Sequence, residues 1–153
     1  MDTSQALAEA VGSTFADLAF MDAEPELSRP GEPSPGQVIG IEFLQPPGGY
    51  LMLHLSVATK QLIIGNIHGV DWESLSGSEV DDCLMELVNI MAGNFLVLVG
   101  AGDSRHSLSL PQVLYDESDL ITDDESVDHY FSVNGETTRV SLKYSPGSQA
   151  PGH

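Results

Sequence analysis

The stretch 81-DDCLMELVNIMAGNF-95 decides the fold. On a helical wheel at about 100° per residue its apolar side chains fall on one side, a spacing that predicts a helix buried against a sheet or another helix. Polar and small side chains fall in a narrow stripe on the opposite side, which we expect to face water. With its neighbour at position 80, the apolar set is Val80, Leu84, Leu87, Val88, Met91 and Phe95, and the stripe is Asp82, Glu86, Asn89 and Gly93.

The stripe places two chemically useful groups together. Glu86 and Asn89 lie one helical turn apart, so their side chains can contact the same partner molecule. Gly93 continues the stripe although a glycine inside a helix costs about 1 kcal/mol relative to alanine, and a small residue there lets another molecule approach closely. A polar helix face that is merely solvated would show the same pattern, and this alternative remains open at this point.

Length and composition predict one globular domain. The 153 residues, 41% of them hydrophobic, suffice for one core or for two fused half-domains that share one. We expect a single domain over residues 1–145 and a flexible polar tail over 146–153. The chain has one cysteine, Cys83, so an intramolecular disulfide is impossible.

The charge of the chain excludes two classes of partner. The formal net charge is −18, with only five lysines and arginines, which excludes nucleic acid and anionic membranes because both require a basic face. It favours a protein partner that carries a basic or metal-bearing patch. We find no signal peptide and no apolar stretch near 20 residues, so we expect the protein in the cytoplasm.

A helix expected over residues 3–20 weakly repeats the central one. A shift of 77 positions places Leu7 on Leu84 and Glu9 on Glu86, but Gly12 falls where the central helix has Asn89. The apolar face is repeated and the polar set has decayed, as if one of two related sites had been lost. Chance similarity between two amphipathic helices also remains open.

The remaining chain predicts strands and turns. Prolines forbid regular structure over 21–36, which we interpret as a surface loop. Residues 37–45 and 50–57 form a hairpin in which alternation predicts a sheet with one buried face. The stretch 59–69 is ambiguous between strand and helix, and we favour a short helix. A strand over 106–110 ends at Pro111.

The C-terminal third contains an acidic loop and a second hairpin. Residues 116–128 carry seven acids among thirteen residues but lack the ligand spacing of a calcium loop, so we expect a solvated loop. Strands over 128–133 and 136–144 flank Asn134-Gly135, a strong hairpin signal. Together the elements predict an α+β fold, an antiparallel sheet with long helices packed on one face.

Several kinds of site can be excluded. The sequence has no glycine-rich phosphate loop, no histidine at zinc-ligand spacing and no serine in a nucleophile elbow, so we expect no metal site. What remains is a carboxylate and a carboxamide on an exposed helix. Such a pair can orient a water and hold a cation if the electrophile arrives on a partner.

The pattern Asp82-x-x-x-Glu86-x-x-Asn89, followed by 21 residues and then Pro111, resembles the signature of the CheC/CheX/FliY chemotaxis phosphatases. The order of helices and strands is also similar over nearly the whole chain. The resemblance implies a CheC-like fold with a pseudo-two-fold repeat. Because only one helix keeps the asparagine, the chain is most similar to CheX-like members, which implies a homodimer.

The resemblance also implies a function, namely hydrolysis of the aspartyl phosphate on a CheY-type response-regulator receiver domain. Asn89 would hold the attacking water and Glu86 would pair with a receiver lysine, while Asp82, Gly93 and Pro111 would contact the partner or shape the surface beside it. The chain would need no cofactor of its own, because Mg²⁺ is expected on the receiver. The alternative is a non-catalytic two-component interaction module of the same fold.

Overall fold

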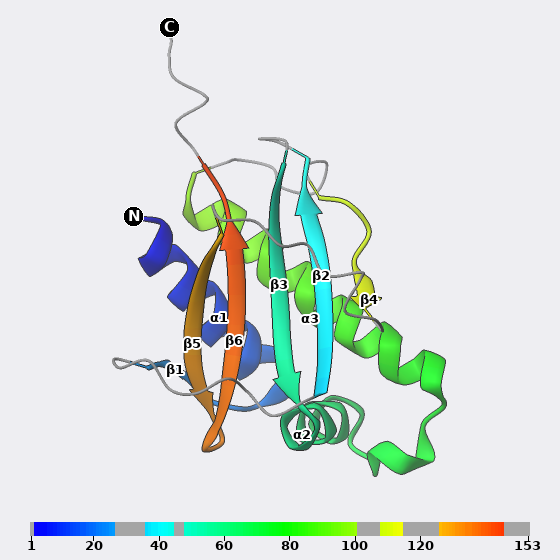
Figure 1. Ribbon diagram of the computed structural model, residues 1–153. Coiled ribbons are helices and arrows are strands. Elements are labelled where there is room, and N and C mark those ends of the chain that lie inside the picture. Colours follow the sequence, from blue (N-terminus) through cyan, green and yellow to red (C-terminus); the bar gives the residue numbers. More distant parts are fainter. Residues whose placement is uncertain (1, 27–35, 45–47, 101–107, 115–125, 146–153) are drawn as a thin grey trace, which may run out of the picture.

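The computed structural model describes residues 2–26, 36–44, 48–100, 108–114 and 126–145. These residues form one antiparallel sheet with helices on one face (Figure 1). The helices are α1 (Thr3–Ala19), α2 (Val57–His68), the single-turn 3₁₀ helix η1 (Trp72–Ser74) and α3 (Gly77–Leu98). The strands are β1 (Ala23–Pro25), β2 (Gly36–Phe43), β3 (Gly49–Ser56), β4 (Gln112–Leu114), β5 (Val127–Val133) and β6 (Glu136–Lys143).

The strand order shows a pseudo-two-fold arrangement. The six strands follow the order β1-β5-β6-β3-β2-β4, and the central pair β3 and β6 runs antiparallel with Leu53 opposite Val140. If β1 is exchanged with β4, β2 with β5 and β3 with β6, the same strand order is obtained, read from the other edge of the sheet. The set α1-β1-β2-β3 is thus repeated by α3-β4-β5-β6, as the weak sequence repeat predicts. Among the described residues, α2 and the short η1 have no counterpart in the second set.

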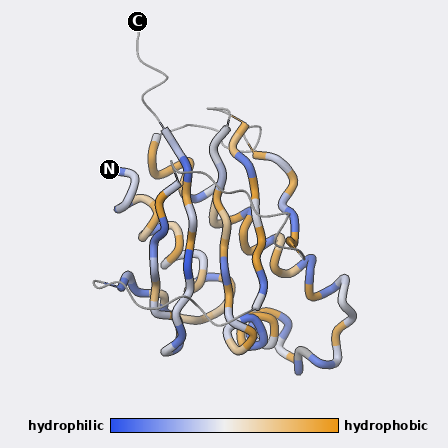
Figure 2. Tube along the Cα trace, viewed as in Figure 1, coloured by the Kyte–Doolittle hydropathy of each residue, from blue (hydrophilic) through white to orange (hydrophobic). Residues whose placement is uncertain are grey.

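The core lies between the sheet and the two long helices. In Figure 1 α1 and α3 lie side by side behind the sheet, and α2 lies at its lower end. Figure 2 shows the alternation of hydrophilic and hydrophobic residues along the strands that places one set of side chains against these helices. The largest side chains of this core, Phe15, Phe43, Phe95 and Phe131, are 2% exposed or less.

The main predicted elements are confirmed. The hairpin β2–β3, the short helix α2 and the hairpin β5–β6 all lie where the sequence places them. Asn134 and Gly135 form the predicted turn, with φ angles of 53° and 81° that match the twist of a tight hairpin. The prediction that 59–69 forms a helix is correct, although the helix begins at Val57.

Two predictions around prolines are wrong. Within the expected loop 21–36, Ala23–Pro25 form β1, which pairs with β5 at the edge of the sheet, where a proline lacking an N–H is tolerated. The strand expected to end at Pro111 instead begins after it, as β4. Of the predicted strand, Leu108 makes an isolated bridge with Phe43. Residues 27–35 and 101–107 lie outside the described residues, as do most of the acidic stretch, 115–125, and the tail, 146–153.

The outer face of the sheet also departs from expectation. Alternation predicts one buried face for β3, yet Tyr50, Met52, His54 and Ser56 on its other face are all less than 9% exposed. β3 is a central strand, and the long side chains of Arg139 and Lys143 on β6 lie opposite His54 and Tyr50. Among the helices that the structure describes, none is both long and apolar enough to span a bilayer.

Candidate functional site

The candidate site lies on α3, whose start is fixed by a complete capping box. Ser76 Oγ accepts a hydrogen bond from the Glu79 amide at 3.2 Å, and Glu79 Oε1 accepts one from the Ser76 amide at 2.9 Å. These two bonds satisfy donors that a helix start otherwise leaves unpaired. The hydrogen bond from the Ser76 amide, and then that of the Ser76 side chain, lower the pKa of the Glu79 carboxyl. The capping box therefore fixes where α3 begins.

Packing fixes how α3 is rotated about its own axis. Asn94 Nδ2 donates to Thr14 Oγ1 of α1 at 3.3 Å, and Thr14 Oγ1 in turn donates to the carbonyl of Ala10 at 2.6 Å. Phe95 stacks on Phe43 of β2 with ring centroids 5.8 Å apart. Helix α3 packs against α1 on one side and against the sheet on the other. Its buried residues are Val80, Cys83, Leu84, Leu87, Val88, Met91, Ala92, Phe95 and Leu96.

The opposite side of α3 presents the predicted stripe to solvent. Asp82, Glu86 and Asn89 are exposed and Gly93 is partly exposed. Three positions separate Glu86 from Asn89, which places their Cβ atoms roughly 5–6 Å apart on a helix. Neither side chain has a hydrogen-bond or ion-pair partner among the described residues. Both groups are therefore available to another molecule.

Pro111 is far from the stripe in sequence. It is half-buried and directly precedes β4, which pairs with β2 and contacts α3 at the edge of the sheet. The fold thus brings the fifth predicted residue next to a strand that contacts α3. A proline at this position fixes the entry of the chain into the edge strand.

The corresponding face of α1 lacks this chemistry. Gln5 and Glu9 are exposed and Gly12 is partly exposed, so the stripe is present in geometry. Gly12 supplies no carboxamide where α3 has Asn89. Helix α1 therefore keeps the carboxylate of the pair, at Glu9, and lacks the carboxamide.

Sequence reasoning did not find a groove that borders the stripe. Leu18 of α1, Ile67 of α2 and Leu87 of α3 line a groove of about 340 Å³, with Asp82 and Glu86 among its other lining residues. Leu18 is only half-buried because it faces this groove. A wheel drawn for one helix cannot show a groove that three helices form.

The described residues contain no group of three histidine, cysteine or acidic side chains that could hold a metal ion. Cys83 is buried beside the groove, and burial raises the pKa of its thiol. A neutral thiol is a poor nucleophile and a poor metal ligand. The chemistry available on α3 is therefore that of a carboxylate and a carboxamide.

The fold and the stripe define a class of protein: an α+β domain that presents a carboxylate and a carboxamide one turn apart on an exposed helix face. The chain belongs to the CheX family, because the family model described as "Chemotaxis phosphatase CheX" matches residues 38–133, more than half of the sequence. None of the curated proteins matches the sequence.

Solved structures of related proteins share the fold. A CheX from Borrelia burgdorferi, solved as a CheX–CheY–BeF₃–Mg²⁺ complex, is 19% identical with a TM-score of 0.70, over 93% of this chain and 97% of that one. CheX from Vibrio vulnificus is 15% identical with a TM-score of 0.71, over 95% and 97%. FliY from Thermotoga maritima is 17% identical with a TM-score of 0.56, over 90% and 84%.

Proposed function

We propose that this protein accelerates hydrolysis of the aspartyl phosphate on a CheY-type receiver domain. The observation that carries the proposal is the pair Glu86 and Asn89, exposed one turn apart on α3 and without partners among the described residues. Membership of a family described as a chemotaxis phosphatase supports it. So does the related CheX that was solved in complex with CheY, BeF₃ and Mg²⁺, since beryllofluoride is an analogue of a phosphoryl group.

The chemistry requires little from the catalyst. Water attacks the phosphorus in line with the acyl oxygen, the P–O bond to the aspartate breaks, and inorganic phosphate and a free carboxylate result. The carboxamide of Asn89 holds the water in line by hydrogen bonding. Mg²⁺, which belongs to the receiver, neutralises the developing charge. Positioning of the water accounts for an acceleration on the order of 10²-fold, about 2.7 kcal/mol of barrier.

Glu86 has a different part in this scheme. Its carboxylate pairs with a lysine of the receiver, which fixes the register of the two proteins so that Asn89 meets the phosphoryl group. Asp82 adds a second carboxylate to the same approach, Gly93 leaves room for the partner, and Pro111 shapes the adjoining sheet edge. None of these residues forms a covalent bond to the substrate.

The Asn89→Ala variant tests the central assignment. We expect it to lose accelerated dephosphorylation, about 10²-fold, while its melting temperature stays unchanged, because an exposed side chain without partners contributes little to stability. Phosphate release from a phosphorylated receiver, measured at saturating protein, gives the rate. Gln112→Ala, which removes an exposed carboxamide on β4, is the matched control. Equal rates for the Asn89→Ala variant and the wild type would refute the role of Asn89.

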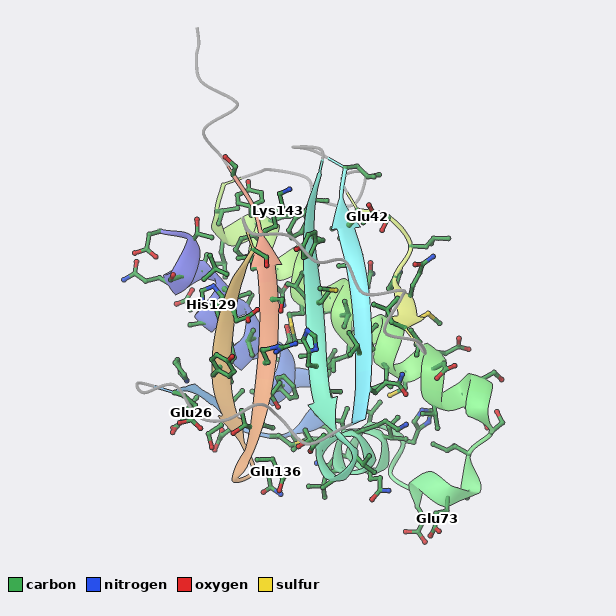
Figure 3. The ribbon with its side chains drawn as sticks, in the orientation of Figure 1. Glu26, Glu42, Glu73, His129, Glu136 and Lys143 are labelled. Atoms are coloured by element: carbon green, nitrogen blue, oxygen red, sulfur yellow. The ribbon has the colours of Figure 1, made fainter. Side chains whose placement is uncertain are left out.

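The Glu86→Ala variant tests docking separately from chemistry. We expect the half-saturating receiver concentration to rise several-fold with little change in the maximal rate, because the ion pair acts on association. Glu73→Ala removes an exposed acid from η1, before α3 begins, and should change neither quantity (Figure 3). A fall in the maximal rate at an unchanged half-saturating concentration would contradict the docking role.

One alternative is favoured by a specific observation. The fold is also similar to a chain in the FliG–FliM complex from H. pylori, at 11% identity and a TM-score of 0.57, over 92% of this chain and 88% of that one. This likeness favours a non-catalytic interaction module on the same scaffold. Phosphate release from the receiver with and without this protein separates the two functions. Dimerisation and a cytoplasmic location belong to the same proposal, and sedimentation in solution tests the first of them.

A further inference from the structure

The groove beside the stripe combines an apolar interior with an acidic edge. Leu18, Ile67 and Leu87 come from three different helices and line its interior, and buried Cys83 adds a fourth apolar surface. Its edge carries the carboxylates of Glu79, Asp82 and Glu86 together with His68. Its volume of about 340 Å³ exceeds that of any one side chain.

This combination selects the chemistry of an occupant. An apolar side chain gains free energy by leaving water for the groove, while three nearby carboxylates repel an anion and attract a cation. Burial raises the pKa of the Cys83 thiol, so the interior stays uncharged at neutral pH. The groove therefore fits a protein segment that carries an apolar side chain next to a basic one.

The groove is continuous with the proposed docking surface. Asp82 and Glu86 belong both to the stripe and to the edge of the groove, and Asn89 lies one turn beyond Glu86. A receiver whose lysine reaches Glu86 therefore places the residues around that lysine over the groove.

We propose that the groove formed by α1, α2 and α3 is a second docking element, which receives an apolar side chain that the receiver domain carries beside its lysine. This inference rests on the proposed function, since it takes the receiver as the partner. In this arrangement the stripe supplies the water and the ion pair, and the groove supplies apolar contact. Affinity for the receiver then depends on residues that lie outside the sequence signature.

The Leu18→Asp variant tests the groove by placing a charge in its apolar interior. Binding is measured by titration with a CheY-type receiver activated by beryllofluoride and Mg²⁺, a readout that needs no turnover. We expect the dissociation constant to rise on the order of tenfold, with the maximal dephosphorylation rate unchanged. Leu62→Asp, at a leucine of α2 that is 39% exposed and does not line the groove, is the matched control and should bind as the wild type does.

The other outcomes decide between explanations. Equal binding by the Leu18→Asp and Leu62→Asp variants overturns the groove proposal, even if Asn89→Ala still abolishes turnover. If wild-type protein binds the receiver but never accelerates dephosphorylation, the proposed function fails while the groove remains testable by binding. Should Leu18→Asp lower the melting temperature, Leu18→Ala replaces it, and a several-fold weaker binding is expected. Dissociation of a dimer by Leu18→Asp, without weaker receiver binding, would assign the groove to a second copy and overturn the proposal.

Discussion

His54 sits in a polar network on the outer face of β3. Nη2 of Arg139 lies 3.1 Å from its Nδ1, and Oγ of Ser141 lies 3.3 Å from its Nε2. Ser141 Oγ also donates to Oδ1 of Asp128 at 2.7 Å. Burial, and then the charge of Arg139, lower the pKa of His54 to about 4, against a smaller opposing effect of Asp128. The native state therefore holds this imidazole neutral.

A pH dependence of stability follows from this residue. The pKa of His54 is about 6.5 when unfolded and about 4 when folded, so between these values the unfolded chain binds the proton. We expect stability to be full above pH 7 and to fall as the pH drops toward 4, by about 3 kcal/mol at most from this group. Urea unfolding at several pH values measures it.

The variant His54→Gln isolates this contribution. Its free energy of unfolding should fall less steeply between pH 7 and 4 than that of the wild type. The variant His68→Gln, at an exposed position, should keep the wild-type slope. Parallel pH curves for wild type and His54→Gln would show that His54 does not drive the dependence.

Single residues also show what a sequence can reveal about the site. Periodicity sufficed to place Glu86 and Asn89 on the exposed side of a helix, because exposure depends on angle within one element. It did not reveal the groove, where Leu18 and Ile67 come together only after three helices have packed. Nor did it reveal that His54 is buried, which depends on Arg139 in a neighbouring strand.

Among the elements, α3 is the rigid support of the stripe. Its first turn depends on the reciprocal bonds between Ser76 and Glu79, and its second half is held by Asn94 and Phe95. Asp82 and Glu86 lie in the turns that directly follow the cap. Fraying of the first turn would therefore loosen the carboxylates before it affected Asn89.

A capping variant tests this support. We expect Ser76→Ala to lower the free energy of unfolding by about 1 kcal/mol, because the side-chain acceptor for the Glu79 amide is removed. Ser76→Asp, which restores an acceptor at the cap, should keep wild-type stability. Denaturant unfolding measures both. Equal loss in the two variants would mean that the side chain at this position, rather than its hydrogen bond, matters.

The edge strands mark the limit of prediction at this scale. Hairpins could be predicted because their turn residues and alternation are local, as at Asn134-Gly135. The strands β1 and β4 span three residues each. Because β1 ends in Pro25 and β4 directly follows Pro111, no local pattern distinguishes them from loop. They exist because β5 and β2 offer unpaired edges, which is a property of the assembled sheet.

At the scale of the whole molecule, charge is the dominant surface property. The 23 acidic residues against five basic ones give the net charge of −18. Acidic side chains occur around the molecule and not only on α3, as Glu26, Glu42, Glu73 and Glu136 show in Figure 3. Such a field attracts a basic docking face over a range set by the Debye length, roughly 10 Å at 0.1 M salt.

Salt should therefore weaken docking. Raising NaCl from about 0.05 M to about 0.5 M should increase the half-saturating receiver concentration several-fold and leave the maximal rate unchanged, because screening acts on association. Sucrose at matched osmolality, which does not screen charge, is the control. A half-saturating concentration that stays constant across the salt series would show that contact is not electrostatic.

The order β1-β5-β6-β3-β2-β4 has one further consequence. Each outermost strand is bound by the opposite half of the molecule, β1 by β5 and β4 by β2. If either half were removed, the outermost strand of the other half would lose the strand with which it pairs. A half-length ancestor could have formed this sheet only as a dimer in which the outermost strand of each copy paired with a strand of the other copy. In the present chain, the two halves pair with each other's outermost strands in the same way.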